Sequence, residues 1–423
     1  MTTEVLDPTW DRHVGGCLYC GRPGPYSDEH VVSAGMGGDD KAWMLRSCVC
    51  RVCNTVVFSK LEAKVLKEGV TSLARLHEQP TTRDRKQAPT MDTHATLLRS
   101  ENNRWAVAEY LAGGVAGVRP QIMLEHLENE DHFGLAAPDE TSLESFRAAV
   151  EQLLAQEFPL VRKDESKQIW VTPLHWSKGR YAPGEEARAD RVPTQGVWMG
   201  RLVAPPEPPD AVLPWTLYQR REGQLVCNVP DTETAALLLT RIRLNHAAIF
   251  PRPDATPAPS RIENPEVFLR IPEDPEARTR VLAKTGLNLL AHLVASDFMR
   301  DPCFDPAVNY VFGRAGATLR HGQAPANAFG PPNENHHDFI LVAKRLDAHG
   351  PWHIQLIARV YGMQPMILLL GRCPSVPSAL EAPIIVHVDY TRHEIRQQTL
   401  EQHAAALACR FAGIQELQPT SEQ

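Results

Sequence analysis

Four cysteines near the start of the chain constrain its fold more than any other feature. They form two Cys-x-x-Cys pairs, Cys17 with Cys20 and Cys50 with Cys53. Each pair can turn two sulfurs toward one ion, so the two pairs supply the four ligands of a tetrahedral site. We predict a structural Zn²⁺ ion there. Cys48 is an alternative ligand to Cys50, but the two-residue spacing favours Cys50 and leaves Cys48 as a small buried apolar residue.

The segment around and between the cysteine pairs carries further motifs in a fixed order. These are Glu29-His30, Gly37-Gly38, Asn54 directly after the last cysteine, Phe58, and Leu61-Glu62. In this order they resemble the HNH endonucleases, in particular the zinc-knuckle branch that has Glu-His where other members have Asp-His. The resemblance covers about residues 15–70. It implies a ββα-metal fold, in which a hairpin and a helix surround the catalytic residues.

Two positions depart from the family pattern. The middle Asn of the family is expected at about Met44–Leu45, where this chain has no Asn. The last position of the motif is Asn54 instead of His, which the family also tolerates.

Phosphodiester hydrolysis requires an activated water molecule and positive charge near the leaving 3′ oxygen. A neutral imidazole is suited to proton abstraction near pH 7, so His30 is the expected general base. A hard divalent ion takes oxygen ligands, and the resemblance implies that Glu29 and Asn54 supply them to Mg²⁺ or Mn²⁺. Asp28 is a weaker candidate for the same oxygen position. Adjacent strand residues point to opposite faces, so Glu29 and His30 share one site only where the hairpin is twisted or bulged.

Each of these residues also has a structural interpretation. Four cysteines at this spacing also occur in zinc ribbons that have no activity. His30 is followed by Val31 and Val32, and a histidine in such a strand is more often partly buried than catalytic. Its place between the thiol pairs favours the catalytic interpretation.

Length and charge bound the remaining possibilities. A chain of 423 residues is expected to form two or three domains. Its formal charge of −7 argues against a generic polyanion-binding protein. From Lys41 to Lys86, however, ten Lys and Arg residues face four acids, a local net charge of +6. Beside a nuclease motif, this stretch is the expected contact for a phosphate backbone, and a solvated helix face is the alternative.

Cysteine usage and hydropathy indicate the compartment. The chain has nine cysteines, and Cys227, Cys303, Cys373 and Cys409 show no pairing pattern. We therefore expect reduced thiols and a cytoplasmic protein. The first residues do not resemble a signal peptide, and no apolar run is long enough for a membrane span.

The predicted fold class is α+β, with an N-terminal ββα-metal (HNH) zinc domain followed by a larger mixed α/β region. Its expected parts are the zinc domain at 1–80, an α+β middle region at 90–250 and an α+β C-terminal region at 275–423. The last two are candidates for one regulatory or binding domain. Helices are expected at 56–78, 141–158, 277–300 and 397–412, and a C-terminal antiparallel meander at 339–343, 353–360, 365–370 and 383–388. Proline-rich crossings are expected at 204–209 and 251–275.

Two polar features of the C-terminal region are candidate sites with structural alternatives. The helix at 277–300 is apolar around most of its girth, so Lys284 and His292 are interpreted as satisfied or snorkelling residues and not as ligands. In the run Asn335-His336-His337-Asp338, the two histidines point to opposite faces of a strand, so only one can join a given metal. A turn with polar caps before a strand is the favoured interpretation.

The sequence thus predicts a metal-dependent endonuclease that acts on nucleic acid, with DNA as the expected substrate. The large C-terminal region is expected to sense a regulatory ligand or dock a protein partner, as in nucleases of bacterial defence. Two rivals remain: a catalytically silent zinc scaffold that binds nucleic acid or another partner, and a subunit of a multi-protein nuclease effector. The missing middle Asn favours the first rival.

Overall fold

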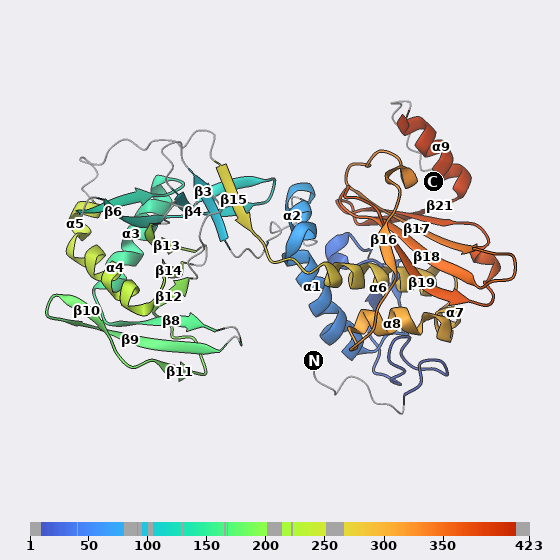
Figure 1. The fold of residues 1–423 in the computed structure, drawn as a ribbon, viewed down its shortest axis with the longest axis horizontal. Helices are drawn as coiled ribbons and strands as arrows, with labels where there is room; N and C mark the ends of the chain where they lie inside the picture. Colours follow the sequence, from blue (N-terminus) through green and yellow to red (C-terminus); the bar gives the residue numbers. More distant parts are fainter. Residues whose placement is uncertain are drawn as a thin grey trace. The chain divides into compact units, whose positions relative to one another are not determined.

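The computed structural model divides the chain into two compact units (Figure 1). It describes residues 10–39, 41–79, 91, 95–99, 105–127, 130–164, 166, 168–200, 214–220, 223–250 and 266–411. The first unit combines Met1–Asp92 with Pro272–Gln423, and the second is Thr93–Ile271. The expected domains at 1–80 and 275–423 therefore share one unit, while the expected middle region falls in the other.

The N-terminal segment has the strand–strand–helix order that the motifs predict. Its elements are β1 (Glu29–His30), η2 (Ala34–Met36), β2 (Met44–Leu45), η3 (Cys53–Phe58), α1 (Ser59–Lys67) and α2 (Gly69–Glu78). The strands β1 and β2 pair antiparallel. The helix expected at 56–78 is divided, because Glu68 is extended and Gly69 adopts a positive φ of 74°. A left-handed glycine ends α1 and lets α2 start in a new direction.

The C-terminal part of the first unit is a helical layer followed by a sheet. Its elements are α6 (Pro275–Leu293), α7 (Ser296–Met299), η5 (Pro302–Phe304), α8 (Asp305–Phe312), β16 (His321–Gln323), η6 (Ala326–Ala328), β17 (His336–Arg345), β18 (Trp352–Arg359), β19 (Met366–Cys373), η7 (Ser378–Leu380), β20 (Ile384–Asp389), β21 (Glu394–Gln398) and α9 (Leu400–Phe411). The strands follow the order β16-β19-β18-β17-β20-β21. All of these pairings are antiparallel, which confirms the predicted meander.

The helix α6 is the centre of the first unit. Asp274 caps it by accepting a hydrogen bond from the Ala277 amide, and Pro275 occupies its first turn. The helix expected at 277–300 ends earlier, at Leu293, and α7 follows as a separate turn. α6 lies beside α1 and also against β17, β18 and β19 (Figure 1). One apolar cluster therefore joins the four-cysteine segment, residues 17–65, to the C-terminal sheet.

The second unit is built on a mixed sheet that carries helices. The strands of this sheet follow the order β10-β9-β8-β12-β14-β13-β6-β7, with β11 also paired to β9, and β15-β3-β4-β5 form a smaller sheet. The strands are β3 (Ala95–Arg99), β4 (Trp105–Leu111), β5 (Val115–Val118), β6 (Gln121–Leu127), β7 (Glu130–Ala136), β8 (Phe158–Lys163), β9 (Ile169–Ser177), β10 (Arg180–Pro183), β11 (Ala187–Ala189), β12 (Val197–Gly200), β13 (Trp215–Gln219), β14 (Leu225–Asn228) and β15 (Glu266–Arg270). The helices are α3 (Glu140–Leu154), α4 (Thr232–Leu244) and α5 (His246–Ile249). The fold is thus mixed α+β, as predicted.

The structure corrects the expectation that the scattered cysteines are all reduced. Cys303 and Cys373 form a disulfide with their Cα atoms 5.3 Å apart, although 70 positions separate them in the chain. The bond joins η5 to the end of β19, a proximity that residue spacing does not reveal. Cys227 and Cys409 are free thiols.

The remaining expectations concern the proline-rich segments and membrane-spanning helices. The proline-rich crossing at 204–209 and most of the one at 251–275 lie outside the described residues. Among the described helices, none combines the length and apolar character that crossing a membrane requires.

Candidate metal and catalytic centre

Cys17, Cys20, Cys50 and Cys53 come together in one buried cluster. Their sulfur atoms all lie within 4.8 Å of one another, and the sulfurs of Cys20 and Cys50 are 3.6 Å apart. A zinc ion with sulfur ligands at about 2.3 Å in a tetrahedron requires sulfurs about 3.8 Å apart. The donor set and the spacing therefore fit Zn²⁺.

Backbone groups hold the thiol cluster in this arrangement. The amide of Cys50 donates to the sulfur of Cys17 at 3.3 Å, and the amide of Cys53 donates to the sulfur of Cys50 at 3.4 Å. Such bonds stabilise thiolates. The first knuckle turns at Gly21, whose φ is 77°, and a Cβ there would approach the Arg12 nitrogen to 2.8 Å. Only glycine fits this turn without displacing the backbone beneath it.

The hairpin of β1 and β2 has two different faces. Glu29 pairs with Leu45, and His30 pairs with Met44. Asp28 is exposed, Glu29 is buried, His30 is half-buried and Val31 is buried. This alternation places Asp28 and His30 on the outer face and Glu29 on the inner face.

On the inner face, the Glu29 carboxylate contacts α6. It forms an ion pair with the ammonium of Lys284, and the two side chains are 4% and 1% exposed. The Asn288 amide also donates to Glu29 Oε1 at 3.3 Å. The structure therefore places Glu29 in a buried polar cluster, where a divalent ion would have to displace Lys284.

Glu62 is the second carboxylate of this cluster. It lies on α1 and also contacts the Lys284 ammonium. Burial works against charge on Lys284, but Glu29 and Glu62 outweigh it and raise the pKa of the lysine. For Glu29, burial raises the pKa of the carboxyl even though Lys284 acts in the opposite direction. Lys284 thus remains charged and supplies the cation for both acids.

On the outer face, Asn54 joins the strand that carries His30. Its amide nitrogen donates to the Asp28 carbonyl oxygen at 2.7 Å and to Ser27 Oγ at 3.2 Å. Both bonds are made by the amide nitrogen of Asn54, so its side-chain carbonyl oxygen is not used in them. The structure therefore ties Asn54 to the backbone of Asp28, two positions before His30, and the alternation of the strand places Glu29 on the opposite side.

Met44 stands in the hairpin at about the position where the HNH motif has its middle Asn. Met44 lies directly across from His30 in the strand register, and the Trp43 carbonyl accepts the Val31 amide at 3.1 Å. An apolar side chain therefore occupies the place opposite His30. Trp43 packs its ring against His292 of α6, with centroids 4.9 Å apart, so His292 serves in packing.

The Gly37-Gly38 turn is fixed by close approach of backbone. Gly37 has a φ of 85°, and a Cβ there would meet the Tyr390 Cα at 2.4 Å. A Cβ on Gly38 would meet the Val32 carbonyl oxygen at 2.0 Å. Gly37 therefore packs on Tyr390 just after the end of β20, and Gly38 packs on the preceding loop, so neither position admits a side chain.

The predicted basic stretch contributes fewer free cations than its sequence suggests. Arg75 is buried and donates to Leu66 and Gln79, and Lys64 pairs with Asp274. Arg83, Arg85 and Lys86 lie outside the described residues. In the described part of this stretch the exposed basic side chains are Lys41, Arg46, Arg51, Lys60, Lys64 and Lys67, and of these Lys64 is paired with Asp274.

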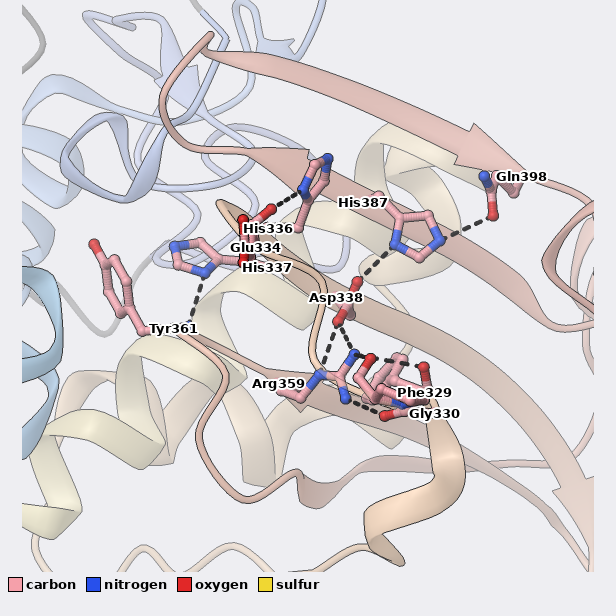
Figure 2. A network of polar contacts seen from close by, with 11 residues as sticks. Phe329, Gly330, Glu334, His336, His337, Asp338, Arg359, Tyr361, His387 and Gln398 are labelled. Atoms are coloured by element: carbon pink, nitrogen blue, oxygen red, sulfur yellow. Dashed lines mark hydrogen bonds and ion pairs between the residues drawn. The ribbon is translucent and has the colours of Figure 1, made fainter. Parts of the chain in front are cut away.

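A second polar cluster lies in the C-terminal sheet, where the sequence predicted only a capped turn. Asp338 lies between Arg359 and His387 (Figure 2). Arg359 donates to Asp338 at 2.8 Å and 2.6 Å, and His387 contacts the other carboxylate oxygen at 2.7 Å. Burial works against the charge on Asp338, but these partners outweigh it and lower the pKa of the carboxyl. Arg359 also donates to Gly330 at 2.6 Å, so the cluster fastens a loop to the sheet.

His337 points to the opposite face from Asp338, as strand alternation requires. It is fully buried beside Tyr361 and Tyr390. The Tyr361 amide donates to its Nδ1 at 3.1 Å (Figure 2). Burial lowers the pKa of His337 to about 3. The two adjacent histidines point to opposite faces, as expected, but both lie within β17 and not in the turn before a strand that the sequence interpretation favoured.

Comparison with protein-family models, with curated proteins and with solved structures found no match to this chain.

Proposed function

We propose that this protein is a metal-dependent endonuclease of the HNH type that hydrolyses phosphodiester bonds of nucleic acid, with DNA as its substrate. The observation that supports this most is the outer face of the hairpin. There Asp28 and His30 share one side of the strand by alternation, and Asn54, which directly follows Cys53 of the four-cysteine cluster, donates to the Asp28 backbone carbonyl. An imidazole, a carboxylate and an amide oxygen are the groups that such a reaction needs.

In this proposal His30 removes a proton from the attacking water molecule. Asp28 and the Asn54 carbonyl oxygen are hard oxygen ligands, the type that Mg²⁺ and Mn²⁺ prefer. When bound there, such an ion would supply positive charge to the phosphate and to the leaving 3′ oxygen. Asn54 also fixes the backbone of Asp28 through its amide nitrogen, so it orients the carboxylate as well.

This assignment changes the oxygen ligand that the motif implies. Glu29 is committed to Lys284 and Asn288 on the inner face, so we assign the ligand role to Asp28. Asp28 is exposed and faces the same side as His30.

The exposed basic side chains support a nucleic-acid substrate. Lys41 and Arg46 flank β2, and Arg46 donates to the Lys41 carbonyl at 2.9 Å. Arg51 lies three positions before Asn54, and its amide donates to Pro25 at 2.8 Å. Arg46 directly follows β2, the strand that pairs with His30, and Arg51 lies two positions before the start of η3. Positive charge there would bind the phosphates on either side of the scissile bond.

A nicking assay with purified full-length protein tests the proposal. Supercoiled DNA, linear duplex, single-stranded DNA and RNA would be incubated with Mg²⁺, with Mn²⁺ or with a chelator. We expect ion-dependent nicking of DNA that disappears in His30→Ala. The matched control is His349→Ala, which removes an exposed histidine of the C-terminal sheet region.

A silent zinc scaffold is the alternative that a specific observation favours. Lys284 already neutralises Glu29, and Met44 faces His30 where the motif has an amide. If the wild-type protein binds DNA but cuts none of the four substrates with either ion, the scaffold replaces the nuclease.

A further inference from the structure

The strand that carries His30 is held by a residue outside the motif. Asn288 of α6 donates to the His30 carbonyl oxygen at 2.9 Å and to Glu29 Oε1 at 3.3 Å. Its own carbonyl oxygen accepts the Tyr19 hydroxyl at 2.5 Å. Tyr19 lies between the first two cysteines of the cluster. One amide therefore links α6 to β1 and to the zinc loop.

Lys284 makes a second link, one helical turn before Asn288. Its ammonium contacts Glu29 of β1 and Glu62 of α1, and its side chain is 1% exposed. Removing an ammonium from water costs several kcal/mol unless charged partners compensate. An apolar side chain at this position would avoid that cost, so a buried lysine here holds specific partners in place.

The opposite side of α6 is fixed to the C-terminal sheet. Gly286 lies between Lys284 and Asn288 in sequence, and a Cβ there would meet Leu370 at 2.8 Å and Leu356 at 3.1 Å. The helix therefore packs closely on β18 and β19 at this point. Lys284 and Asn288 on one side of α6 and Gly286 on the other therefore fix the distance between the β1–β2 hairpin and the C-terminal sheet.

We propose that Asn288 and Lys284 are positioning residues for His30, so that α6 of the C-terminal segment completes the catalytic centre. This inference rests on the proposed nuclease function. Asn288 fixes the position and twist of the His30 backbone through its hydrogen bond to the His30 carbonyl oxygen. Lys284 keeps Glu29 on the inner face, which orients His30 toward the outer face. A catalytic group displaced by about 1 Å loses about 100-fold in rate.

The Asn288→Leu variant tests the inference, because leucine has a similar volume and cannot form any of the three hydrogen bonds. We expect kcat to fall about 100-fold with KM unchanged within about two-fold, since the substrate contacts remain. Zinc content should stay at one per chain. The NMR signal of the His30 ring should shift. The control is Glu276→Gln, which alters an exposed residue of the same helix.

Tyr19→Phe is the second variant, for the case in which Asn288→Leu does not fold. It removes one hydroxyl and keeps the ring against Phe58 and Phe312. We expect a several-fold loss of kcat and a smaller shift of the His30 signal. Folded variants whose His30 signal and kcat equal those of the wild type would overturn the inference. If the wild type does not cleave, the nuclease proposal fails, and the His30 signal still decides whether Asn288 positions that residue.

Discussion

Glu29 and Lys284 form an ion pair whose side chains are only 4% and 1% exposed. The acid belongs to the hairpin beside the cysteine cluster, and the lysine belongs to a helix that starts more than two hundred residues later. Their contact helps make the four-cysteine segment and the C-terminal sheet parts of one folded unit. It also separates Glu29 from the face on which His30 lies.

Removal of one partner of this pair should be strongly destabilising. In Lys284→Met, Glu29 keeps a buried carboxylate without its cation, and breaking a buried pair in this way costs about 3–5 kcal/mol. The double variant Lys284→Met/Glu29→Met should recover part of this loss, because the acid that remains without a cation is Glu62, whose side chain is 19% exposed. Urea unfolding of both variants and of Glu29→Met alone measures the coupling.

The surface pair Arg147–Glu151 is the matched control for that experiment, because both side chains are partly exposed on one helix. Its disruption should change the free energy of unfolding by less than about 1 kcal/mol. Equal costs for the buried and the surface pair would contradict the buried charge cluster.

The cysteine cluster should bind one zinc ion per chain, measured by elemental analysis of fully reduced protein. In Cys50→Ser, the loss of zinc should destabilise residues 1–80 and also parts of the chain beyond them. The apolar cluster of the zinc segment continues into α6 and the C-terminal sheet, so amide exchange should rise in α6 as well. Cys48→Ser should retain the metal, and a protein without zinc would exclude the site.

The four-cysteine cluster was predictable because its ligands are close in sequence and their chemistry admits few alternatives. Two Cys-x-x-Cys turns converge on one ion wherever the chain brings them together. The meander was predictable for a similar reason, since each of its strands alternates with a nearby turn. Local patterns determine both features.

The partners of Glu29, Asp338 and Cys303 were not predictable from the sequence. Glu29 pairs with Lys284, Asp338 with Arg359 and His387, and Cys303 with Cys373. Each of these partners is distant in sequence and comes close only when the sheet and helices fold together. A lysine in an apolar helix signals only that some partner must compensate its charge. The alternation of β1 did contain one usable signal, because it places Asp28 and His30 on one face and Glu29 on the other.

His337 should make the first unit less stable as the pH falls. Burial lowers its pKa to about 3, whereas an unfolded histidine titrates near pH 6.5. Between these two values the unfolded chain binds a proton that the folded chain does not, so the free energy of unfolding decreases with decreasing pH. The loss across the window should be on the order of 4 kcal/mol.

Urea unfolding of wild type and His337→Phe at several pH values measures this contribution. Phenylalanine cannot accept the Tyr361 amide, so the variant should be less stable at neutral pH by about 1–3 kcal/mol. Its stability should then depend less on pH between 6.5 and 3. Parallel pH curves for the two proteins would show that His337 is protonated in the folded state.

The two acids of the hairpin should respond differently when each is replaced by its amide. Asp28→Asn weakens an oxygen ligand on the His30 face, so cleavage should require several-fold more Mg²⁺ while the free energy of unfolding changes by less than about 0.5 kcal/mol. Glu29→Gln leaves Lys284 with Glu62 as its remaining acid, so it should lower stability without changing the Mg²⁺ requirement of the folded fraction. Initial nicking rates across a Mg²⁺ titration, together with urea unfolding, separate these effects. The reverse result, in which Glu29→Gln alters the ion requirement and Asp28→Asn does not, would return the ligand role to Glu29 and require Lys284 to move before cleavage.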